Sequence, residues 1–169
     1  MSHQPVIDGF EFASAGATQQ GVLPVSEFPR LRDLLASDAG EVAYEVTGLR
    51  DERGRPSLRL SVKGTVQVRC QRCLEAMPVE VDEEELLVLA ATQAEIDADP
   101  TDAEAPDRVL GGKAMALREL VEDQLILALP YAPRHERCAG GAEKGREEAK
   151  EQDKVLPFAA LKGMMRGRN

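Results

Sequence analysis

The chain has 169 residues, which is enough for one domain with a modest core. Aromatic residues make up 4% with no Trp, and charged residues make up 30%, so the core must be built from Val, Leu, Ile and Ala. The net charge of −9 argues against a chain-wide affinity for nucleic acid, since nonspecific binding to phosphates depends on Lys and Arg.

The first forty residues predict three short elements. A short helix is expected near 10–17, followed by a strand at 22–25. Ser26 is a suitable N-cap for a helix over 27–35, in which the apolar residues share one face at helical spacing. Gly40 ends this part of the pattern.

The middle of the chain alternates apolar and polar residues, which is typical of strands with one buried face. The even positions are mostly apolar in 42–46 and again in 58–70, on either side of the turn-rich segment 51–56. This pattern predicts two antiparallel strands, the second long and bent at Gly64. The odd positions of the second strand must project from the opposite face, so its basic residues should form a solvated stripe.

The rest of the pattern predicts further strands, an acidic loop and one main helix. Apolar residues at 79–81 and 86–91 extend a meander to about four to six strands. Acidic residues and two prolines in 93–107 indicate a mobile, disordered acidic loop. Residues 114–128 predict an amphipathic helix that Pro130 terminates.

Together these elements predict an α+β fold. It is an antiparallel β-sheet meander with the main amphipathic helix packed on it and a short N-terminal helix. Residues 1–138 are expected to form a single domain, and 139–169 a flexible linker that leads to a short apolar and basic C-terminal segment. Within the main helix, Glu122 and Asp123 are expected on the polar side, solvated or in contact with the basic strand.

Four soft ligands gather in two short patches of the sequence, and they predict a metal site. They are Cys70, Cys73, His135 and Cys138. A Cys-x2-Cys pair lets both thiolates reach one ion, and the downstream His and Cys would complete a tetrahedral Cys3His set for Zn2+. Such a site would tie the strand corner to the segment after the main helix, and it would leave no open position for catalysis.

Three other interpretations of these residues stay open. Without a metal or any other cofactor, Cys70 is a buried strand residue, Cys73 a partly exposed thiol, and the downstream pair part of a flexible tail. A redox role would need a thiolate at a helix N-terminus, but Pro78 disfavours a long helix there and the acidic neighbours would raise a thiol pKa. His135 and Cys138 could also serve as base and nucleophile, yet a histidine in a Pro-rich loop usually lies on the surface.

Cysteine number and apolar distribution predict a cytoplasmic protein. No apolar run approaches the roughly 18 residues of a membrane span, and residues 1–9 lack the basic cluster and apolar run of a secretion signal. Three cysteines cannot all pair, so we expect reduced thiols.

Charge is sorted along the chain. Residues 50–72 hold seven basic and two acidic side chains, whereas 75–107 hold twelve acidic side chains and no Lys or Arg. The basic side chains that would contact RNA phosphates or a partner are Arg53, Arg55, Arg59, Lys63, Arg69 and Arg72. Scarce aromatic residues argue against reading of single-stranded sequence by stacking. The alternatives are a solvated sheet face that pairs with the acidic loop, and an acidic segment that engages a basic partner protein.

Three stretches in a fixed order give the chain a family resemblance. They are 66–74 around the Cys-x2-Cys pair, 120–130 in the main helix, and 133–135 before Cys138. In this combination they resemble the bacterial YceD family, the large ribosomal RNA subunit accumulation proteins. The resemblance runs from roughly Leu23 to the end motif at 157–159.

The resemblance implies a non-enzymatic ribosome-biogenesis factor that supports the synthesis, processing or stability of large-subunit (23S) ribosomal RNA. Its partners would be that RNA or its assembly proteins, directly or indirectly, with no membrane and no small-molecule substrate. The alternative is a thiol-redox or RNA-processing enzyme that uses the Cys-x2-Cys corner. A hydrolytic nuclease needs clustered carboxylates or histidines, and the acidic residues here are spread over a loop-like stretch.

Overall fold

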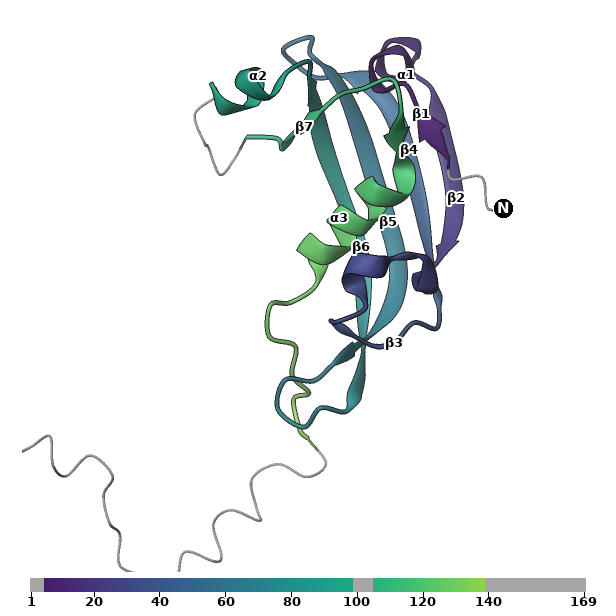
Figure 1. Cartoon of the computed structure of the whole chain (residues 1–169), viewed down its shortest axis with the longest axis vertical. Coiled ribbons are helices and arrows are strands. Elements are labelled where there is room, and N and C mark those ends of the chain that lie inside the picture. Colours follow the sequence, from purple (N-terminus) through teal and green to yellow (C-terminus); the bar gives the residue numbers. More distant parts are fainter. Residues whose placement is uncertain (1–4, 99–104, 139–169) are drawn as a thin grey trace, which may run out of the picture. The chain divides into compact units, whose positions relative to one another are not determined.

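The computed structural model describes residues 5–98 and 105–138, and Figure 1 shows its elements along the chain. The elements are β1 (Val6–Ile7), α1 (Gly9–Ala15), β2 (Thr18–Pro24), η1 (Val25–Glu27), η2 (Pro29–Leu31), β3 (Leu35–Ser37), β4 (Glu41–Arg50), β5 (Pro56–Arg69), β6 (Ala76–Ala90), α2 (Gln93–Asp97), β7 (Arg108–Leu110), β8 (Met115–Ala116) and α3 (Leu117–Ala128). The chain divides into two compact units, residues 1–135 and 136–169. All of these elements lie in the first unit. The predicted tail over 139–169 lies outside the described residues, and the single domain over 1–138 stays a prediction.

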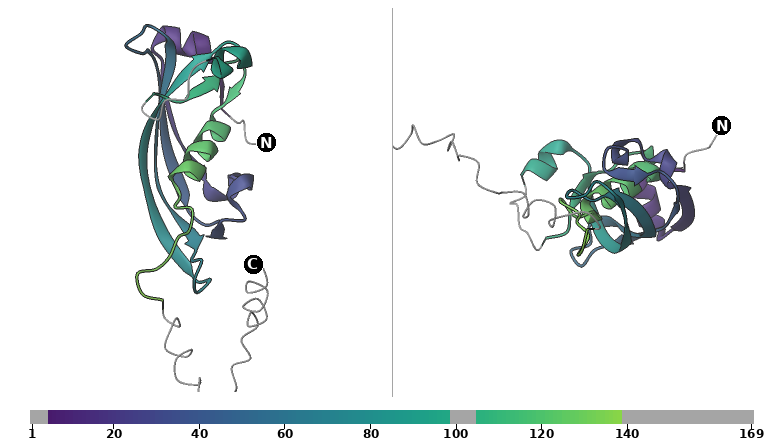
Figure 2. Two further views of the ribbon diagram at one scale, coloured as in Figure 1. Left: turned by 90° about the vertical axis from the view of Figure 1, so that its left-hand side faces the viewer. Right: turned by 90° about the horizontal axis from the view of Figure 1, so that it is seen from below.

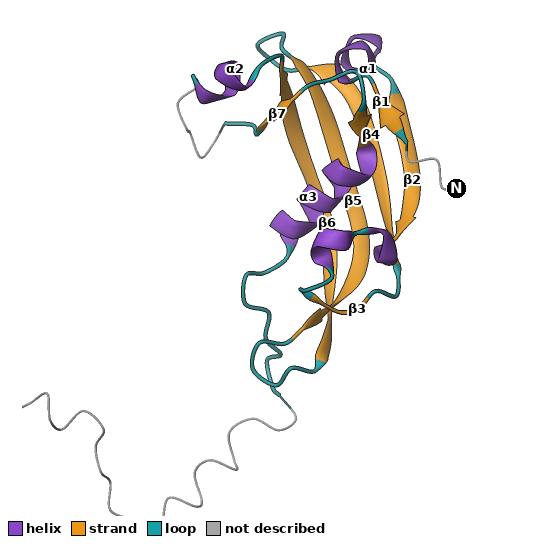
Figure 3. Ribbon diagram, viewed as in Figure 1, coloured by secondary structure: helices purple, strands orange, loops and turns teal. Residues whose placement is uncertain are grey.

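Six strands form the main sheet, in the order β2-β4-β5-β6-β7, with β3 paired to β5. Neighbours from β2 to β6 are antiparallel, as a meander requires. β7 departs from the predicted meander because it joins the edge of β6 in parallel, which needs the longer crossover that follows β6. β1 and β8 form a separate antiparallel pair. The chain is α+β, as predicted, with strands predominating (Figure 3).

The alternation predicted for β4 and β5 is confirmed. In β4 the side chains of Val42, Tyr44 and Val46 are buried, and in β5 the even positions from 58 to 68 are buried except for Gly64. At Gly64 the two strands come close, since a Cβ there would lie 3.0 Å from the carbonyl oxygen of Glu41. Period two therefore gives the sheet one apolar face and one polar face.

α3 and the two turns η1 and η2 lie on the same, concave side of the sheet (Figure 2). α3 packs on β5 and β6. The core on this side contains Phe28 and Leu31 from the turns together with Leu117, Val121 and Leu125 from α3, all of them fully buried. No described helix covers the opposite side, where the charged residues of the central strands meet solvent.

Two predicted helices change their extent. The helix predicted over 27–35 is wrong, because η1 and η2 are short 3-10 turns and β3 begins at Leu35. Phe28 precedes a proline, which disfavours the α conformation in that residue, and it adopts φ −100° and ψ 88°. α3 begins at Leu117 instead of 114, since Met115 and Ala116 pair with β1.

The disordered loop predicted over 93–107 is wrong in its first part. α2 covers Gln93–Asp97, and the Thr92 side chain caps it by accepting a hydrogen bond from the Glu95 amide. Residues 99–104 lie outside the described residues. In the part of the chain that the structure describes, no helix is long and apolar enough to cross a membrane.

Candidate metal centre

The turn between β5 and β6 places the Cys-x2-Cys pair at one end of the sheet. The Leu74 amide donates to the Cys70 carbonyl at 2.9 Å, and the Cys70 amide donates to the Glu75 carbonyl at 2.9 Å. Leu74 adopts φ 63°, the left-handed conformation that closes the turn. These bonds hold Cys70 and Cys73 on the same corner, as the sequence predicts for a ligand pair.

Hydrogen bonds of the main chain and of two side chains also hold the segment after α3 against this corner. The Gln71 amide donates to the Pro133 carbonyl at 2.8 Å. The Arg72 side chain donates to the His135 carbonyl at 3.3 Å, and His135 Nε2 lies 3.3 Å from the Ala76 carbonyl oxygen. Two hydrogen bonds therefore fix the position of His135, one through its backbone carbonyl and one through its ring.

The four predicted ligands are brought together. One ligand atom from each of Cys70, Cys73, His135 and Cys138 lies within 4.8 Å of all the others, so the set could hold a metal ion. Cys73 Sγ is 3.4 Å from His135 Nδ1, and bonds of zinc length at tetrahedral angles put sulfur and nitrogen about 3.6 Å apart. Cys138 follows His135 by three residues, so the chain itself keeps the last thiol within reach.

The imidazole of His135 has the orientation of a ligand. The Ala76 carbonyl can only accept a hydrogen bond, so Nε2 carries the proton and Nδ1 keeps its lone pair toward the cysteines. A histidine that binds a metal through one nitrogen commonly donates the other N–H to a carbonyl in this way. The geometry therefore suits a Cys3His set with Nδ1 as the nitrogen ligand.

The Cys70 thiol has the electrostatic environment of a thiolate. Burial of Cys70 raises its pKa, but hydrogen bonds from the backbone of Cys73, Arg72 and His135 and from the Cys73 side chain outweigh burial and lower the pKa to about 5. Acidic neighbours are not among the causes of this shift, so the rise that the sequence predicts for a thiol pKa is not seen at Cys70. The thiolate is the form that binds a metal, and since Cys70 is fully buried, an outside disulfide cannot reach it.

The predicted basic residues do not form one positive surface. Arg59 lies 3.6 Å from Glu84 and Lys63 lies 3.0 Å from Asp82, on the neighbouring strand β6. The six positions divide between the turn that joins β4 to β5 (Arg53, Arg55), the outer face of β5 (Arg59, Lys63, Arg69) and the metal corner (Arg72). The acids that pair with the stripe come from β6, and not from the 93–107 loop that the sequence left open as one alternative.

Arginines do gather around the turn between β4 and β5. A cavity of about 640 Å³ there is lined by Arg50, Arg53, Arg55 and Arg59, with Asp51 among the acids beside them. Asp51 accepts hydrogen bonds from the Arg53 and Arg55 amides and from Arg55 Nε, the last at 2.7 Å. The loop is thus held by one buried carboxylate while its arginines surround the cavity.

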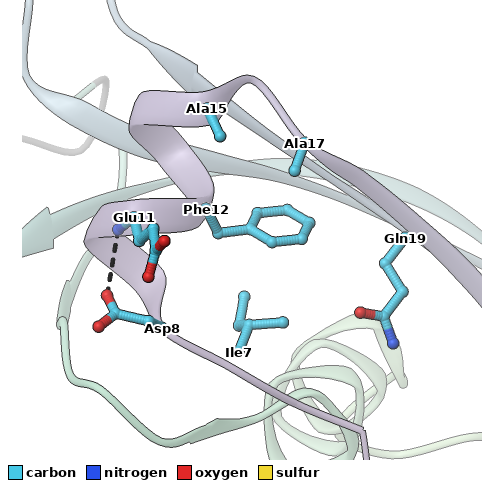
Figure 4. Close-up of a pocket in the computed structure, with 7 residues that line it drawn as sticks. All are labelled: Ile7, Asp8, Glu11, Phe12, Ala15, Ala17 and Gln19. Atoms are coloured by element: carbon cyan, nitrogen blue, oxygen red, sulfur yellow. Dashed lines mark hydrogen bonds between the residues drawn. The ribbon is translucent and has the colours of Figure 1, made fainter.

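A second cavity, of about 300 Å³, lies between α1 and β2 and holds none of the predicted site residues (Figure 4). Its acids include Asp8, whose carboxylate accepts a hydrogen bond from the Glu11 amide as the N-cap of α1. The remaining wall is supplied by Ile7, Glu11, Phe12, Ala15, Ala17 and Gln19. Asp8 thus has a structural role as the N-cap of α1, and we assign no function to the cavity.

Sequence reasoning missed an ion pair between the turn η2 and α3. Glu122 is buried, and its carboxylate accepts from the Arg30 amide at 2.6 Å and from Arg30 Nε at 3.0 Å. Asp123, which is half exposed, accepts from Arg30 Nη1 at 2.6 Å. Glu122 therefore lies on the packed side of the helix and not on its polar side. A usable signal was present, since Glu122 stands directly after Val121 and three residues before Leu125.

Comparison with known proteins places the chain in a family. Residues 58–165 match the model of the family described as Large ribosomal RNA subunit accumulation protein YceD. The match starts later than the resemblance seen from Leu23, and it contains all four predicted ligands. Neither a curated protein nor a solved structure matches the chain. Because the match covers more than half of the 169 residues, the chain belongs to the YceD family.

Proposed function

We propose that the chain is a cytoplasmic, non-enzymatic ribosome-biogenesis factor that supports the synthesis, processing or stability of large-subunit (23S) ribosomal RNA. The family description names accumulation of large-subunit ribosomal RNA, which supports a ribosome-related role. The observation that carries the non-enzymatic part is the Cys3His set, because four protein ligands fill a tetrahedral zinc shell and leave no position for water or substrate.

In this proposal the metal is a structural clip. Bound Zn2+ would join the corner between β5 and β6 to the chain that follows α3, through Cys70, Cys73, His135 and Cys138. The ligands lie more than sixty residues apart in sequence, so the clip closes a long loop. A core poor in aromatic residues gains from such a clip, since structural zinc contributes folding free energy directly.

Direct contact with RNA, if the factor makes it, is proposed for the arginine-lined cavity at the turn between β4 and β5. Arg53, Arg55 and Arg59 belong to the predicted binding set, and Arg50 joins them around the cavity. Lys63 pairs with Asp82 on an outer face that carries acids from β4 and β6 as well. Phosphate contact therefore fits the turn better than the whole stripe.

The test is depletion of the protein from a cell that carries it, followed by measurement of both ribosomal RNAs. We expect large-subunit RNA to fall while small-subunit RNA is largely maintained, and wild-type protein to restore it. Equal loss of the two RNAs would contradict the proposal. Rescue by Arg53→Ala/Arg59→Ala compared with rescue by Lys63→Ala/Arg69→Ala, a pair of equal charge change, tests whether the turn is the contact.

A second experiment separates the scaffold from a thiol-redox enzyme. Metal content is measured on protein purified without added metal or a metal-binding tag, for the wild type and for Cys70→Ser and Cys138→Ser. One zinc per chain, lost in both variants together with thermal stability, supports the clip. A metal-free protein whose thiols reduce a disulfide substrate with turnover would support the enzyme instead.

A further inference from the structure

A groove lies between α3 and the edge of the sheet formed by β6 and β7. Two cavities, of about 340 and 320 Å³, make it up, and both are lined by Asp107, Gln124 and Leu127. The groove shares no residue with the Cys3His set or with the arginine-lined cavity. It is therefore a separate surface, to which neither the metal clip nor the proposed RNA contact assigns a use.

The larger cavity has an apolar wall beside Arg30 and Asp123, which pair with each other. Leu87 and Val109 from the sheet face Leu120, Ile126 and Leu127 from α3. Leu127 is 70% exposed, although it lies on a helix whose other leucines are buried or half-buried. An exposed leucine at the rim of an apolar hollow suits the insertion of one aliphatic or aromatic side chain from outside.

The smaller cavity is acidic. It is lined by Glu83, Glu85 and Asp107, and none of the three forms an ion pair with the residues that the structure describes. Glu83 and Glu85 pair in register with Val62 and Leu60, on the face of β6 that packs the core elsewhere. Three uncompensated carboxylates beside one hollow attract cationic groups and repel phosphate.

Gln124 gives the groove a hydrogen-bonding group that the fold leaves unused. The residue is 8% exposed and lines both cavities. Its side-chain amide forms no hydrogen bond with any described residue, and its nitrogen and oxygen are not among the buried atoms that lack a partner, so the amide is open to solvent in the groove. One amide offers a donor and an acceptor together, which is what the backbone of an extended peptide requires.

We propose that this groove binds a Lys- and Arg-rich segment of a protein partner. One apolar side chain of the segment fills the cavity beside Leu127, its cationic side chains meet Glu83, Glu85 and Asp107, and its backbone bonds to Gln124. The inference rests on the proposed function, because it names a basic protein as one partner of a factor that serves ribosomal RNA. It also assigns protein and RNA to different surfaces of the chain.

The probe is a fluorescein-labelled decapeptide of two Lys-Leu-Lys-Phe-Lys repeats, and binding is measured by fluorescence polarisation at low salt. We expect Glu83→Gln/Glu85→Gln to weaken binding about tenfold, because two exposed ion pairs to the peptide are lost. Glu41→Gln/Glu45→Gln is the matched control. It changes the net charge equally on the outer face of β4 and should leave the affinity within about twofold.

A variant of Gln124 separates binding from folding. Gln124→Met keeps the length of the side chain and removes the unused amide, so the thermal midpoint of the unbound protein should stay the same or rise. The same variant should bind the decapeptide about tenfold more weakly. A decapeptide with Ala in place of Leu and Phe should also lose about tenfold, since it cannot fill the cavity beside Leu127.

Four outcomes would overturn the groove proposal. They are no binding of the decapeptide, equal loss in the Glu41→Gln/Glu45→Gln control, unchanged binding by Gln124→Met, and tighter binding of a uridine decamer that Leu127→Ser abolishes. None of these depends on the RNA levels in depleted cells. Peptide binding with equal loss of both ribosomal RNAs would sink only the proposed function, and selective RNA loss without peptide binding would sink only the groove.

Discussion

We expect the substitution Glu122→Gln to destabilise the fold by about 2–4 kcal/mol. The Glu122 side chain is 2% exposed, and its two oxygens accept separate hydrogen bonds from Arg30, one from the backbone amide at 2.6 Å and one from Nε at 3.0 Å. Glutamine keeps one acceptor. Its amide nitrogen then faces an arginine donor, whichever way the group is turned.

The expected magnitude follows from these two bonds. One charge-assisted hydrogen bond of about 1.5–3 kcal/mol is lost, and a donor left facing a donor adds about 1 kcal/mol. Asp123 is 54% exposed and lies 2.6 Å from Arg30 Nη1, closer than Glu122 lies to Nε. Exposed pairs contribute about 0–1 kcal/mol, so Asp123→Asn should cost less despite the shorter contact.

Urea unfolding followed by circular dichroism gives the free energy of unfolding of each variant, provided that the slope m is unchanged. In an Arg30→Ala background the glutamine oxygen can still accept from the backbone amide, and the buried carboxylate has lost its side-chain partner, so Glu122→Gln should cost much less there. Equal losses for Glu122→Gln and Asp123→Asn, or a loss below about 0.5 kcal/mol for Glu122→Gln, would refute burial as the source of the effect.

Three further predictions concern the corner and the turn. Chelation of the metal, or Cys73→Ser, should lower the thermal midpoint by roughly 10 °C in a melting scan, and an unchanged midpoint would exclude a structural metal. Leu74 is exposed and left-handed at φ 63°, so Leu74→Gly should raise the free energy of unfolding by about 0.5–1 kcal/mol in urea, whereas a loss would contradict strain at that residue. Burial raises the pKa of Asp51, but hydrogen bonds from Arg55 and Arg53 outweigh it and the pKa is lowered. Its stabilising effect is therefore complete above the pKa of an unfolded aspartate, about 3.9, and is lost as the pH falls through the lower folded value. Asp51→Asn should cost about 1–2 kcal/mol at pH 7 and almost nothing below that folded pKa, and a difference that persists in acid would contradict the linkage.

The strands of this chain could be predicted because their information is local. Alternation along β4 and β5 sets the buried face residue by residue, and the structure follows it except at Ser57, which is buried, and at Gly64. The ligand set could be predicted for a different reason: thiols and imidazoles are few in this sequence, and their spacing fits one ion. The sequence alone could not show that the two patches lie within ligand distance.

The contacts that sequence reasoning missed join residues far apart in the chain. Arg30 forms an ion pair with Glu122, and β7 pairs with β6 in parallel. No local sequence pattern predicts either contact. The basic segment misled for a related reason. The net charge of a sequence segment does not give the charge of a surface. Arg59 and Lys63 lie beside Glu84 and Asp82 of the neighbouring strand β6.

The pairing of β1 with β8 fixes an order of events during synthesis. Val6 has its partner in Ala116, so the amino end of the chain must wait until nearly all of the sheet has left the ribosome. α3 follows β8 directly, and until it emerges the apolar faces of β4 and β5 are covered only in part, by α1 and by the turns η1 and η2. A nascent chain stalled just after β8 would thus expose part of the apolar face of the sheet and would be prone to aggregate. Closure of the core must therefore wait for the synthesis of α3.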